Sequence, residues 1–260
     1  MTSNESIKVL ASIQARMGSS RLPGKVMKDV LNKPLLLRQV DRIKKCKNIS
    51  QIVIATTTNK NDDAIVEMCK KNDILYYRGS EDDVLGRVAS LLEHYNADIH
   101  AEFVGDSPLP DIDIIDKFIS IFIEERDKID YLSNCLKTTY PPGLDVILYN
   151  SKILVDLHKE LDINDPLREH VGYNITRFPN KFKIKSIEAP SKHFQPDLYL
   201  EVDNKEDFIL IEKIFRHFLS QGIEYFSLDD ILCLIESNPK LKKINQDVKR
   251  NWKILRGEES

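Results

Sequence analysis

Short apolar runs alternate with longer segments whose apolar residues recur at helical spacing, and this pattern continues as far as Asn134. The short runs predict strands at Ile7–Ile13, Gln51–Thr56, Ile74–Tyr77, Ile99–Val104 and Asp130–Ser133. The periodic segments between them predict helices at Leu35–Lys45, Asp62–Lys71, Asp82–His94 and Ile112–Glu125. Strands that alternate with helices are typical of an α/β fold, with a mostly parallel sheet and helices on both of its faces.

The alternation breaks down after Asn134. Tyr140-Pro141-Pro142-Gly143 predicts a loop, because consecutive prolines fit neither a helix nor a central strand. Beyond it the pattern predicts strands at Leu144–Tyr149, Phe182–Ile187 and Leu198–Val202, and helices at Ser151–Leu161, Asp165–Arg177, Lys205–Ser220 and Ser227–Glu236. Because no linker or repeat is evident, we expect residues 1–260 to form a single domain, with the middle region as an excursion from the main sheet.

The most distinctive chemistry lies in the segment Ala15–Lys25, between the first predicted strand and the first predicted helix. It combines the cations Arg16, Arg21 and Lys25 with two glycines and two serines. Glycines let several backbone N–H groups face one point, and the cations add charge-assisted hydrogen bonds, so the loop suits a polyphosphate. A solvated basic turn is the alternative. The segment matches neither the G-x-x-x-x-G-K-[ST] phosphate loop nor the G-x-G-x-x-G dinucleotide pattern.

Two aspartates follow predicted strands. Asp106 comes after Ile99–Val104, and Asp203 comes after Leu198–Val202. In a parallel sheet both would lie at the carboxyl edge, beside the basic loop. Paired carboxylates that face a triphosphate indicate Mg²⁺, which takes one or two carboxylates and completes its shell with phosphates and waters. The structural alternative for each aspartate is a helix N-cap, above all for Asp203, which precedes a predicted helix.

Polar residues at other strand ends also have both a functional and a structural interpretation. Thr56 ends the second predicted strand, and Ser80 follows the third. Ser80 would either contact a ligand or cap the next helix. Arg168 and His170 lie in a helical pattern, where a solvated arginine and an ordinary core or surface histidine are the alternatives to a site.

Composition narrows the possible partners. The chain has 260 residues, of which 42% are hydrophobic, and a formal net charge of −3. This charge gives no support for nucleic-acid binding, so a polyanion site must be local. The four cysteines show no C-x-x-C spacing, which argues against a zinc site or a disulfide framework. The sequence begins without a signal-peptide pattern and has no membrane-spanning apolar run, so we expect a cytoplasmic protein that does not bind membranes.

Seven blocks of the sequence together resemble the cytidylyltransferase family of the spore coat polysaccharide biosynthesis protein SpsF, which is related to the Kdo and acylneuraminate cytidylyltransferases. They are collinear from about residue 7 to about residue 245, and the first is the most specific. The blocks are Ser12–Val26, Ile52–Thr57, Tyr77–Leu85, Gly105–Leu109, Gly143–Val146, Arg168–Val171 and Val202–Phe208.

The resemblance implies a Rossmann-like nucleotide-diphospho-sugar transferase fold and the transfer of CMP from CTP to a sugar or sugar-like acceptor. Pyrophosphate would be released and Mg²⁺ used, in the synthesis of surface polysaccharide precursors. It implies that relatives form dimers through the excursion, here about Thr138–Pro196, so a homodimer is expected.

The resemblance also implies site residues by motif position. The catalytic residues would be Arg16, Lys25, Asp106 and Asp203, of which Asp106 and Asp203 would hold Mg²⁺. Nucleotide contacts would come from Ala15, Arg16, Gly18, Ser19, Arg21, Lys25, Ala55, Thr56, Arg78, Ser80 and Asp106. Acceptor contacts would come from Glu102, Asp145, Arg168, Glu169, His170, Tyr199 and Glu201. Glu169, His170 and Asp145 are candidates for a general base that the motifs do not identify.

Three positions depart from the family pattern. Glu102 stands where the pattern has an arginine, three residues before Gly105-Asp106, and Tyr199 and Glu201 replace an arginine and a threonine. A carboxylate in place of a cation would disfavour an acidic or phosphorylated group of the acceptor there. A non-sugar acceptor, such as a phosphorylated polyol or a phosphonate, and a nucleotide-binding protein without turnover are the alternatives.

Overall fold

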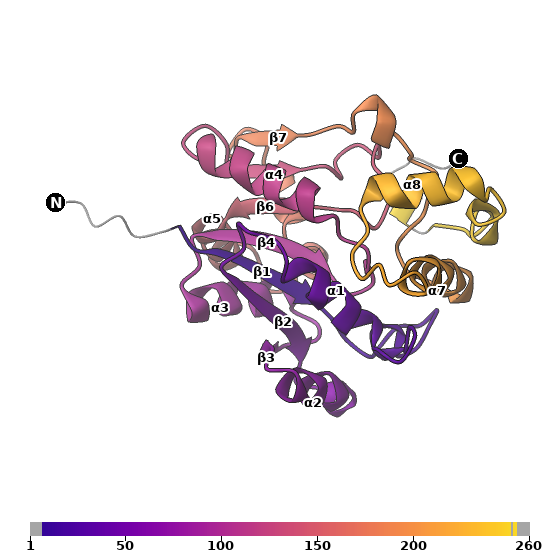
Figure 1. The fold of residues 1–260 in the computed structure, drawn as a ribbon. Coiled ribbons are helices and arrows are strands. Elements are labelled where there is room, and N and C mark those ends of the chain that lie inside the picture. The colour runs from indigo at the N-terminus through magenta and orange to yellow at the C-terminus, as the bar shows by residue number, and fades with distance from the viewer. Residues whose placement is uncertain (1–6, 251, 254–260) are drawn as a thin grey trace.

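The computed structural model of the chain describes residues 7–250, 252 and 253. It has a seven-stranded sheet of order β3-β2-β1-β4-β6-β5-β7 (Figure 1). The strands are β1 (Val9–Gln14), β2 (Gln51–Thr57), β3 (Leu75–Gly79), β4 (Ile99–Val104), β5 (Tyr131–Ser133), β6 (Ile147–Asn150) and β7 (Ile184–Ser186). Neighbouring strands pair in parallel except for β6, which runs antiparallel to β4 and β5. The predicted mostly parallel α/β sheet is confirmed.

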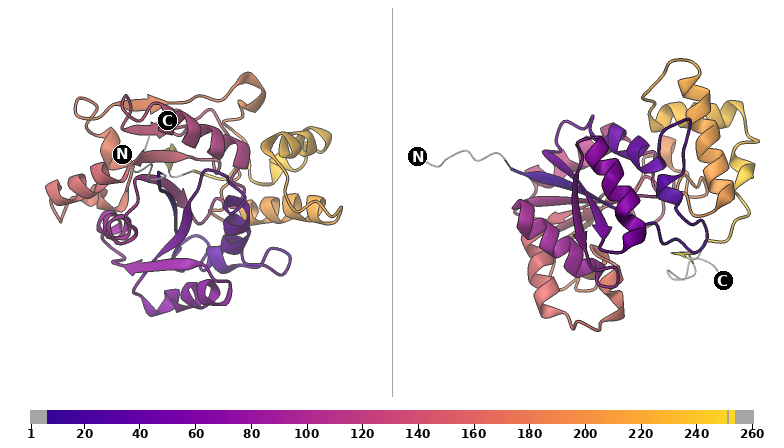
Figure 2. Two further views of the ribbon diagram at one scale, coloured as in Figure 1. Left: turned by 60° about the vertical axis from the view of Figure 1, so that its left-hand side comes forward. Right: turned by 90° about the horizontal axis from the view of Figure 1, so that it is seen from below.

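Helices cover both faces of this sheet, as the sequence pattern predicts (Figure 2). Successive residues of a strand point to opposite faces, and those of β1 enter two apolar clusters. Ala11 and Ile13 pack with α1, α4, α7 and α8, whereas Leu10 packs with α3 and α5. The helices are α1 (Leu35–Ile43), α2 (Asp63–Lys71), α3 (Val84–Tyr95), α4 (Ile112–Glu124), α5 (Ser151–Glu160), α6 (Tyr173–Thr176), α7 (Lys205–Leu219) and α8 (Leu228–Ser237).

The segment Leu198–Val202 is irregular and is not a strand of the sheet, so this prediction is wrong. Its backbone bonds to two loops instead. Leu200 N–H donates to the carbonyl of Pro142, and Val202 N–H donates to the carbonyl of Asp106, both at 2.8 Å. An apolar run indicates that a segment is buried, but it does not show which part of the chain takes the backbone hydrogen bonds of that segment. These bonds hold the residues after Val202 against the loop that follows β4.

The predicted continuous helix Asp165–Arg177 is also wrong. A 3-10 turn at Pro166–Glu169 and the single turn of α6 replace it. Between them Gly172 donates its N–H to Oε2 of Glu102 on β4, at 3.0 Å. A Cβ at Gly172 would lie 2.7 Å from that oxygen, so the chain bends toward the sheet more closely than a helix with side chains allows.

The middle region, about residues 138–196, extends the main sheet in part, because it supplies β6 and β7. The region is therefore only partly an excursion from the main sheet. Its part in dimerisation stays a prediction. Among the residues that the structure describes, every helix is too short or too polar to cross a bilayer.

Candidate active site

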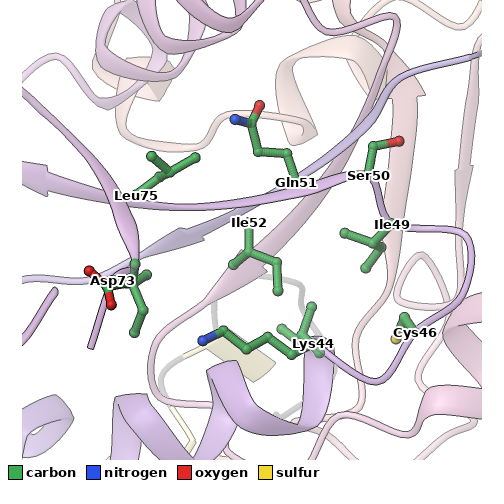
Figure 3. Close-up of a pocket in the computed structure, with 10 residues that line it drawn as sticks. Lys44, Cys46, Ile49, Ser50, Gln51, Ile52, Asp73 and Leu75 are labelled. Carbon is green, nitrogen blue, oxygen red and sulfur yellow. The ribbon is translucent and has the colours of Figure 1, made fainter.

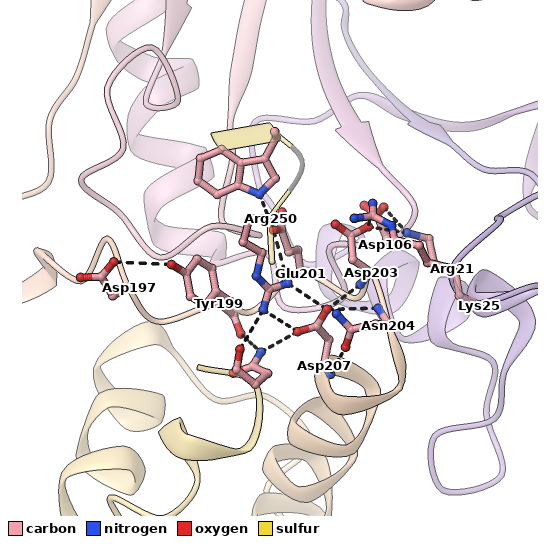
Figure 4. Close-up of polar contacts among 12 residues, drawn as sticks. Arg21, Lys25, Asp106, Asp197, Tyr199, Glu201, Asp203, Asn204, Asp207 and Arg250 are labelled. Atoms are coloured by element: carbon pink, nitrogen blue, oxygen red, sulfur yellow. Dashed lines mark hydrogen bonds and ion pairs between the residues drawn. The ribbon is translucent and has the colours of Figure 1, made fainter. Parts of the chain in front are cut away.

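Three segments far apart in the sequence meet beside the carboxyl ends of β1 and β4 (Figure 4). They are the basic loop Ala15–Lys25, the loop that carries Asp106, and the turn into α7 that carries Asp203. Lys25 Nζ lies 2.7 Å from Asp106 Oδ2 and 3.1 Å from Asp203 Oδ1. Those two carboxylate oxygens are therefore at most 5.8 Å apart, the sum of the two distances. The predicted convergence of both aspartates at one edge is confirmed.

Charge dominates this convergence. Arg21 Nη2 also approaches Asp203 Oδ1, at 2.8 Å, so two cations face two carboxylates. Burial alone would lower the pKa of Lys25, but the adjacent Asp106 and Asp203 outweigh it and raise that pKa above its ordinary value. Lys25 is consequently an ammonium at neutral pH. It bridges the two carboxylates at the position where their combined charge attracts a cation most strongly.

The basic loop owes its shape to its own backbone bonds. The carbonyl of Met17 accepts from the N–H groups of Ser19 and Gly24, both at 3.0 Å. Gly24 has a φ of 66°, a left-handed conformation that a side chain would strain. The turn places Lys25 at the start of a 3-10 helix, Lys25–Met27, with its side chain toward the aspartates.

Arg16 takes a different direction from the other two cations of the loop. Its side chain is 52% exposed and pairs with Glu81, in the loop after β3, at 3.2 Å. Glu81 was not singled out by the sequence pattern, because it lies far from Arg16 in the chain. The pair closes the loop against the start of α3 and leaves Arg16 accessible to a ligand.

The predicted nucleoside-side residues lie on β2 and β3. Ala55 and Thr56 are buried within β2, and Thr56 Oγ1 has no hydrogen-bond partner among the described residues. Arg78 donates to the carbonyls of Thr57 and Asn59 and to Asp63. These bonds give Arg78 a structural role in holding the loop after β2, and its contact with a nucleoside stays a prediction.

Ser80 does not cap α3, so the structural alternative is wrong in detail: the N-cap is Asp83, and Ser80 holds the turn before it. Its Oγ accepts from the N–H of Asp83, at 3.0 Å, in the turn before α3. The Asp83 side chain in turn caps α3 by accepting from Gly86 N–H. A nucleoside contact by Ser80 remains untested, and Ser80 is exposed enough to make one.

Arg168 lies in a buried ion pair instead of on an open surface. Its guanidinium donates to both carboxylate oxygens of Asp83, at 3.0 and 2.9 Å, and contacts His158. Neighbouring Glu169 and His170 are exposed, 3.9 Å from each other. The contacts of Arg168 tie the 3-10 turn to α3 and α5, and its acceptor contact stays a prediction.

Glu102 is 8% exposed and ends a chain of buried hydrogen bonds across the sheet. Ser12 contacts His100 at 2.7 Å, His100 contacts Tyr149 at 2.6 Å, and Tyr149 donates to Glu102 at 2.9 Å. Burial raises the pKa of Glu102 to about 7, although hydrogen bonds from Tyr149, Gly172 and Gln14 oppose the rise. Because its hydrogen bonds join it to β1, β6 and Gly172 inside the fold, Glu102 has a packing role, and its acceptor contact stays a prediction.

The other two departures from the family pattern face the end of the chain. Tyr199 is buried with its ring 4.1 Å from the Arg250 guanidinium, and Glu201 accepts from Trp252 Nε1 at 2.7 Å. Burial, followed by the charges of Asp203, Asp106 and Asp145, raises the pKa of Glu201 to about 8. Tyr199 and Glu201 therefore hold the end of the described chain, and an acceptor contact by either residue stays a prediction. Asp145 stays a candidate, because its charge acts on Glu201, two residues before Asp203.

A hollow of about 400 Å³ lies elsewhere in the molecule (Figure 3). It opens at the amino ends of β2 and β3, beside the end of α1. Its lining residues include Lys44, Cys46, Gln51 and Asp73. The cations and aspartates described above converge at the opposite ends of the strands, so this hollow is not the candidate site.

Cations and paired aspartates at the carboxyl edge of a mostly parallel sheet are typical of enzymes that handle phosphorylated nucleotides. Residues 10–231 match the family model described as Cytidylyltransferase, and the chain belongs to the cytidylyltransferase family. It is therefore a nucleotidyltransferase. The match favours an enzyme over the alternative of a nucleotide-binding protein without turnover.

Three relatives support the same assignment. The chain is similar to a solved cytidylyltransferase from Leptospira borgpetersenii serovar Hardjo-bovis, with a TM-score of 0.85 and 31% identity, over 94% of this chain and 100% of that one. It is 29% identical to the spore coat polysaccharide biosynthesis protein SpsF of Bacillus subtilis, over 89% of this chain and 95% of SpsF. It is 26% identical to the 3-deoxy-manno-octulosonate cytidylyltransferase of Christiangramia forsetii, over 72% of this chain and 80% of that protein. The resemblance to SpsF-type enzymes is confirmed.

Proposed function

We propose that this enzyme transfers CMP from CTP to a sugar or sugar-like acceptor, releases pyrophosphate, and serves the synthesis of surface glycan precursors. The observation that carries the proposal is the convergence of Arg21 and Lys25 with Asp106 and Asp203 at one edge of the sheet. The named activities of the similar proteins, a spore coat polysaccharide protein and a sugar-acid cytidylyltransferase, support the nucleotide and the acceptor class.

The residues present suit Mg²⁺. The described part of the chain contains no cluster of three or more His, Cys, Asp or Glu side chains for a metal, so a cation here would rely on Asp106 and Asp203 and on oxygens of the substrate. Mg²⁺ commonly binds in this way, through two carboxylates, phosphates and waters. Lys25 already occupies the point between the carboxylates as a cation. When bound, Mg²⁺ would polarise the α-phosphate that is attacked.

The side chains of this chain would act mainly by position and charge. An acceptor oxygen attacks the α-phosphorus in line, and the bond to pyrophosphate breaks. Lys25, Arg21 and the exposed Arg16 would offset the charge that builds on the phosphates, with Lys25 exchanging its contact with the aspartates for one with the triphosphate. Water is kept from Lys25 by its burial, which strengthens each of these interactions.

An assay of pyrophosphate release tests the proposal. The wild-type enzyme is given CTP, Mg²⁺ and a panel of acidic, neutral and amino sugars, phosphorylated polyols and phosphonates. We expect release with CTP and a sugar, and loss of release in Asp203→Asn, which removes one carboxylate charge without changing size. Lys137→Met, at a surface ion pair, is the matched control and should retain the rate. Release with only a polyol or a phosphonate would replace the proposed sugar acceptor with that class. Absence of pyrophosphate release with every acceptor of the panel would reject the proposal.

A further inference from the structure

The Asp203 backbone is held by a second aspartate four residues later. Asp207 Oδ2 accepts from the N–H groups of Asp203, at 2.9 Å, and Asn204, at 3.2 Å. In return Asn204 Oδ1 accepts from Asp207 N–H at 3.0 Å, which completes the capping box of α7. Asp207 is fully buried. Its carboxylate therefore determines the backbone position from which the Asp203 side chain reaches Lys25.

Asp207 is itself held from the end of the chain. Arg250 donates to both of its carboxylate oxygens, at 2.9 and 2.7 Å, and Asn245 donates to Oδ1 at 2.7 Å (Figure 4). The Arg250 side chain is 1% exposed, and its guanidinium lies 4.1 Å from the ring centre of Tyr199. A buried pair of charges with two parallel hydrogen bonds is rigid, because loss of either partner leaves the other unpaired in a dry site.

The terminal segment, defined here by the described residues 245–250, 252 and 253, contacts the Asp203 turn at a second point. Trp252 donates to Glu201, two residues before Asp203. Figure 4 shows Arg250 on one side of Asp203 and Asn204, with Lys25 and Arg21 on the other. The segment lies beyond residues 10–231, the part of the chain that matches the family model.

We propose that Arg250 is a positioning residue for Asp203: through Asp207 it sets the turn that presents the carboxylate to the metal and the triphosphate. The inference rests on the proposed function, because it assigns Asp203 to a metal-bound nucleotide. Outer partners that orient a metal ligand typically change metal affinity by 10- to 100-fold when they are removed. A purely structural anchor would instead change stability and leave the metal dependence as it is.

Calorimetric titration separates these two roles. CTP is titrated into wild type, Arg250→Met, Arg250→Lys and Lys253→Met, once with Mg²⁺ and once with EDTA. The ratio of the two CTP affinities is the gain in CTP affinity that Mg²⁺ provides. Lys253→Met is the matched control, because Lys253 belongs to the same segment and faces the same Tyr199 ring but pairs with Asp197 instead of Asp207. The half-saturating Mg²⁺ concentration of pyrophosphate release is measured in parallel.

We expect the gain in CTP affinity from Mg²⁺ to fall about tenfold in Arg250→Met and by less in Arg250→Lys. The CTP affinity measured in EDTA should stay unchanged. Lys253→Met should match wild type. Trp252 is the single tryptophan, so its fluorescence reports whether the segment is still docked. If Arg250→Met does not fold, Arg250→Lys decides, because it keeps a cation beside Asp207. An unchanged gain in a folded Arg250 variant would overturn the inference alone, whereas no gain from Mg²⁺ in wild type would overturn the proposed metal function as well.

Discussion

Lys25 is the residue at which the charges of the site meet. It joins Asp106 and Asp203, which lie 81 and 178 residues further along the chain. The sequence predicts this meeting for Asp106, because parallel strands bring their carboxyl ends together. The predicted position of Asp203 is also correct, although the predicted strand before it is absent. Backbone hydrogen bonds from Leu200 and Val202 to two loops bring Asp203 to the carboxyl edge instead.

Residues whose partners are distant could not be predicted. Arg168 pairs with Asp83, 85 residues away, and Arg250 pairs with Asp207, 43 residues away. Local sequence shows a cation in a helical pattern in the first case and a cation near the chain end in the second. Only the folded chain shows that each lies in a buried pair. The capping box Asn204–Asp207, by contrast, is a local signal that the sequence carries.

Lys25→Ala should reduce turnover by on the order of 10²–10³, because a group that offsets transition-state charge is lost from a site with little water. Steady-state pyrophosphate release at saturating CTP measures the effect, and a thermal melt checks that the variant is folded. Lys33→Ala is the control, since Lys33 is an exposed lysine of the same region that pairs with Asp41. A rate within twofold of wild type for Lys25→Ala would place the triphosphate elsewhere.

At the scale of elements, the hydrophobic pattern predicted the strands of the amino-terminal half and the long helices. The central strands are buried on both faces and give continuous apolar runs, whereas each helix buries one face and gives a periodic pattern. The hydrophobic pattern misplaced the segments whose form depends on contacts across the fold. Predicted strand Leu144–Tyr149 begins only at Ile147, because the Asn134 side chain takes the backbone groups of Leu144 and Val146. Predicted helix Asp165–Arg177 is divided where Gly172 meets Glu102 on β4.

The burial of Glu102 beneath β6 and Gly172 should make stability depend on pH, because burial raises the pKa of this carboxyl although its hydrogen bonds oppose the rise. Its pKa is about 7 in the folded chain and 4.5 ordinarily, so between these values the folded state binds a proton that the unfolded state has released. This stabilisation is fully present below about pH 4.5 and is lost as the pH rises through about 7. The difference in free energy of unfolding is on the order of 3 kcal/mol.

Urea denaturation between pH 5 and 8 measures this dependence. In Glu102→Gln the contribution should disappear, because glutamine does not titrate and its carbonyl still accepts a hydrogen bond. Glu188→Gln, at an exposed ion pair, should keep the wild-type slope. Identical slopes in wild type and Glu102→Gln would show that Glu102 titrates at its ordinary pKa.

For the whole molecule, nucleotide binding should stabilise the fold by mass action, by about 2.7 kcal/mol at a ligand concentration of 100 Kd. Thermal melts with Mg²⁺ and each of the four common nucleoside triphosphates should show the largest shift for CTP. Inorganic triphosphate serves as the control for charge alone. Equal shifts for all four nucleotides would remove the cytidine preference and leave only a phosphate site.

We also expect the molecule to assemble into a symmetric homodimer through the middle region. β7 is an edge strand bonded on one side by β5, and Ile163 and Tyr173 are 66% and 54% exposed in the same region. Exposed edges and apolar side chains are commonly covered by a second copy, and C2 dimers are the commonest arrangement. Light scattering at micromolar concentration should give twice the 30.0 kDa chain mass. The mass of a single chain would contradict the expectation.

The most direct test of the central claim is a crystal structure of the enzyme with CTP and Mg²⁺. The account predicts the triphosphate in the loop Ala15–Lys25, the cytosine beside β2, and one Mg²⁺ ion on Asp106 and Asp203 at the usual oxygen distances of about 2.0–2.1 Å. Lys25 should have turned from the aspartates to a phosphate. A nucleotide bound away from this edge, or a metal ion that touches neither aspartate, would contradict the account.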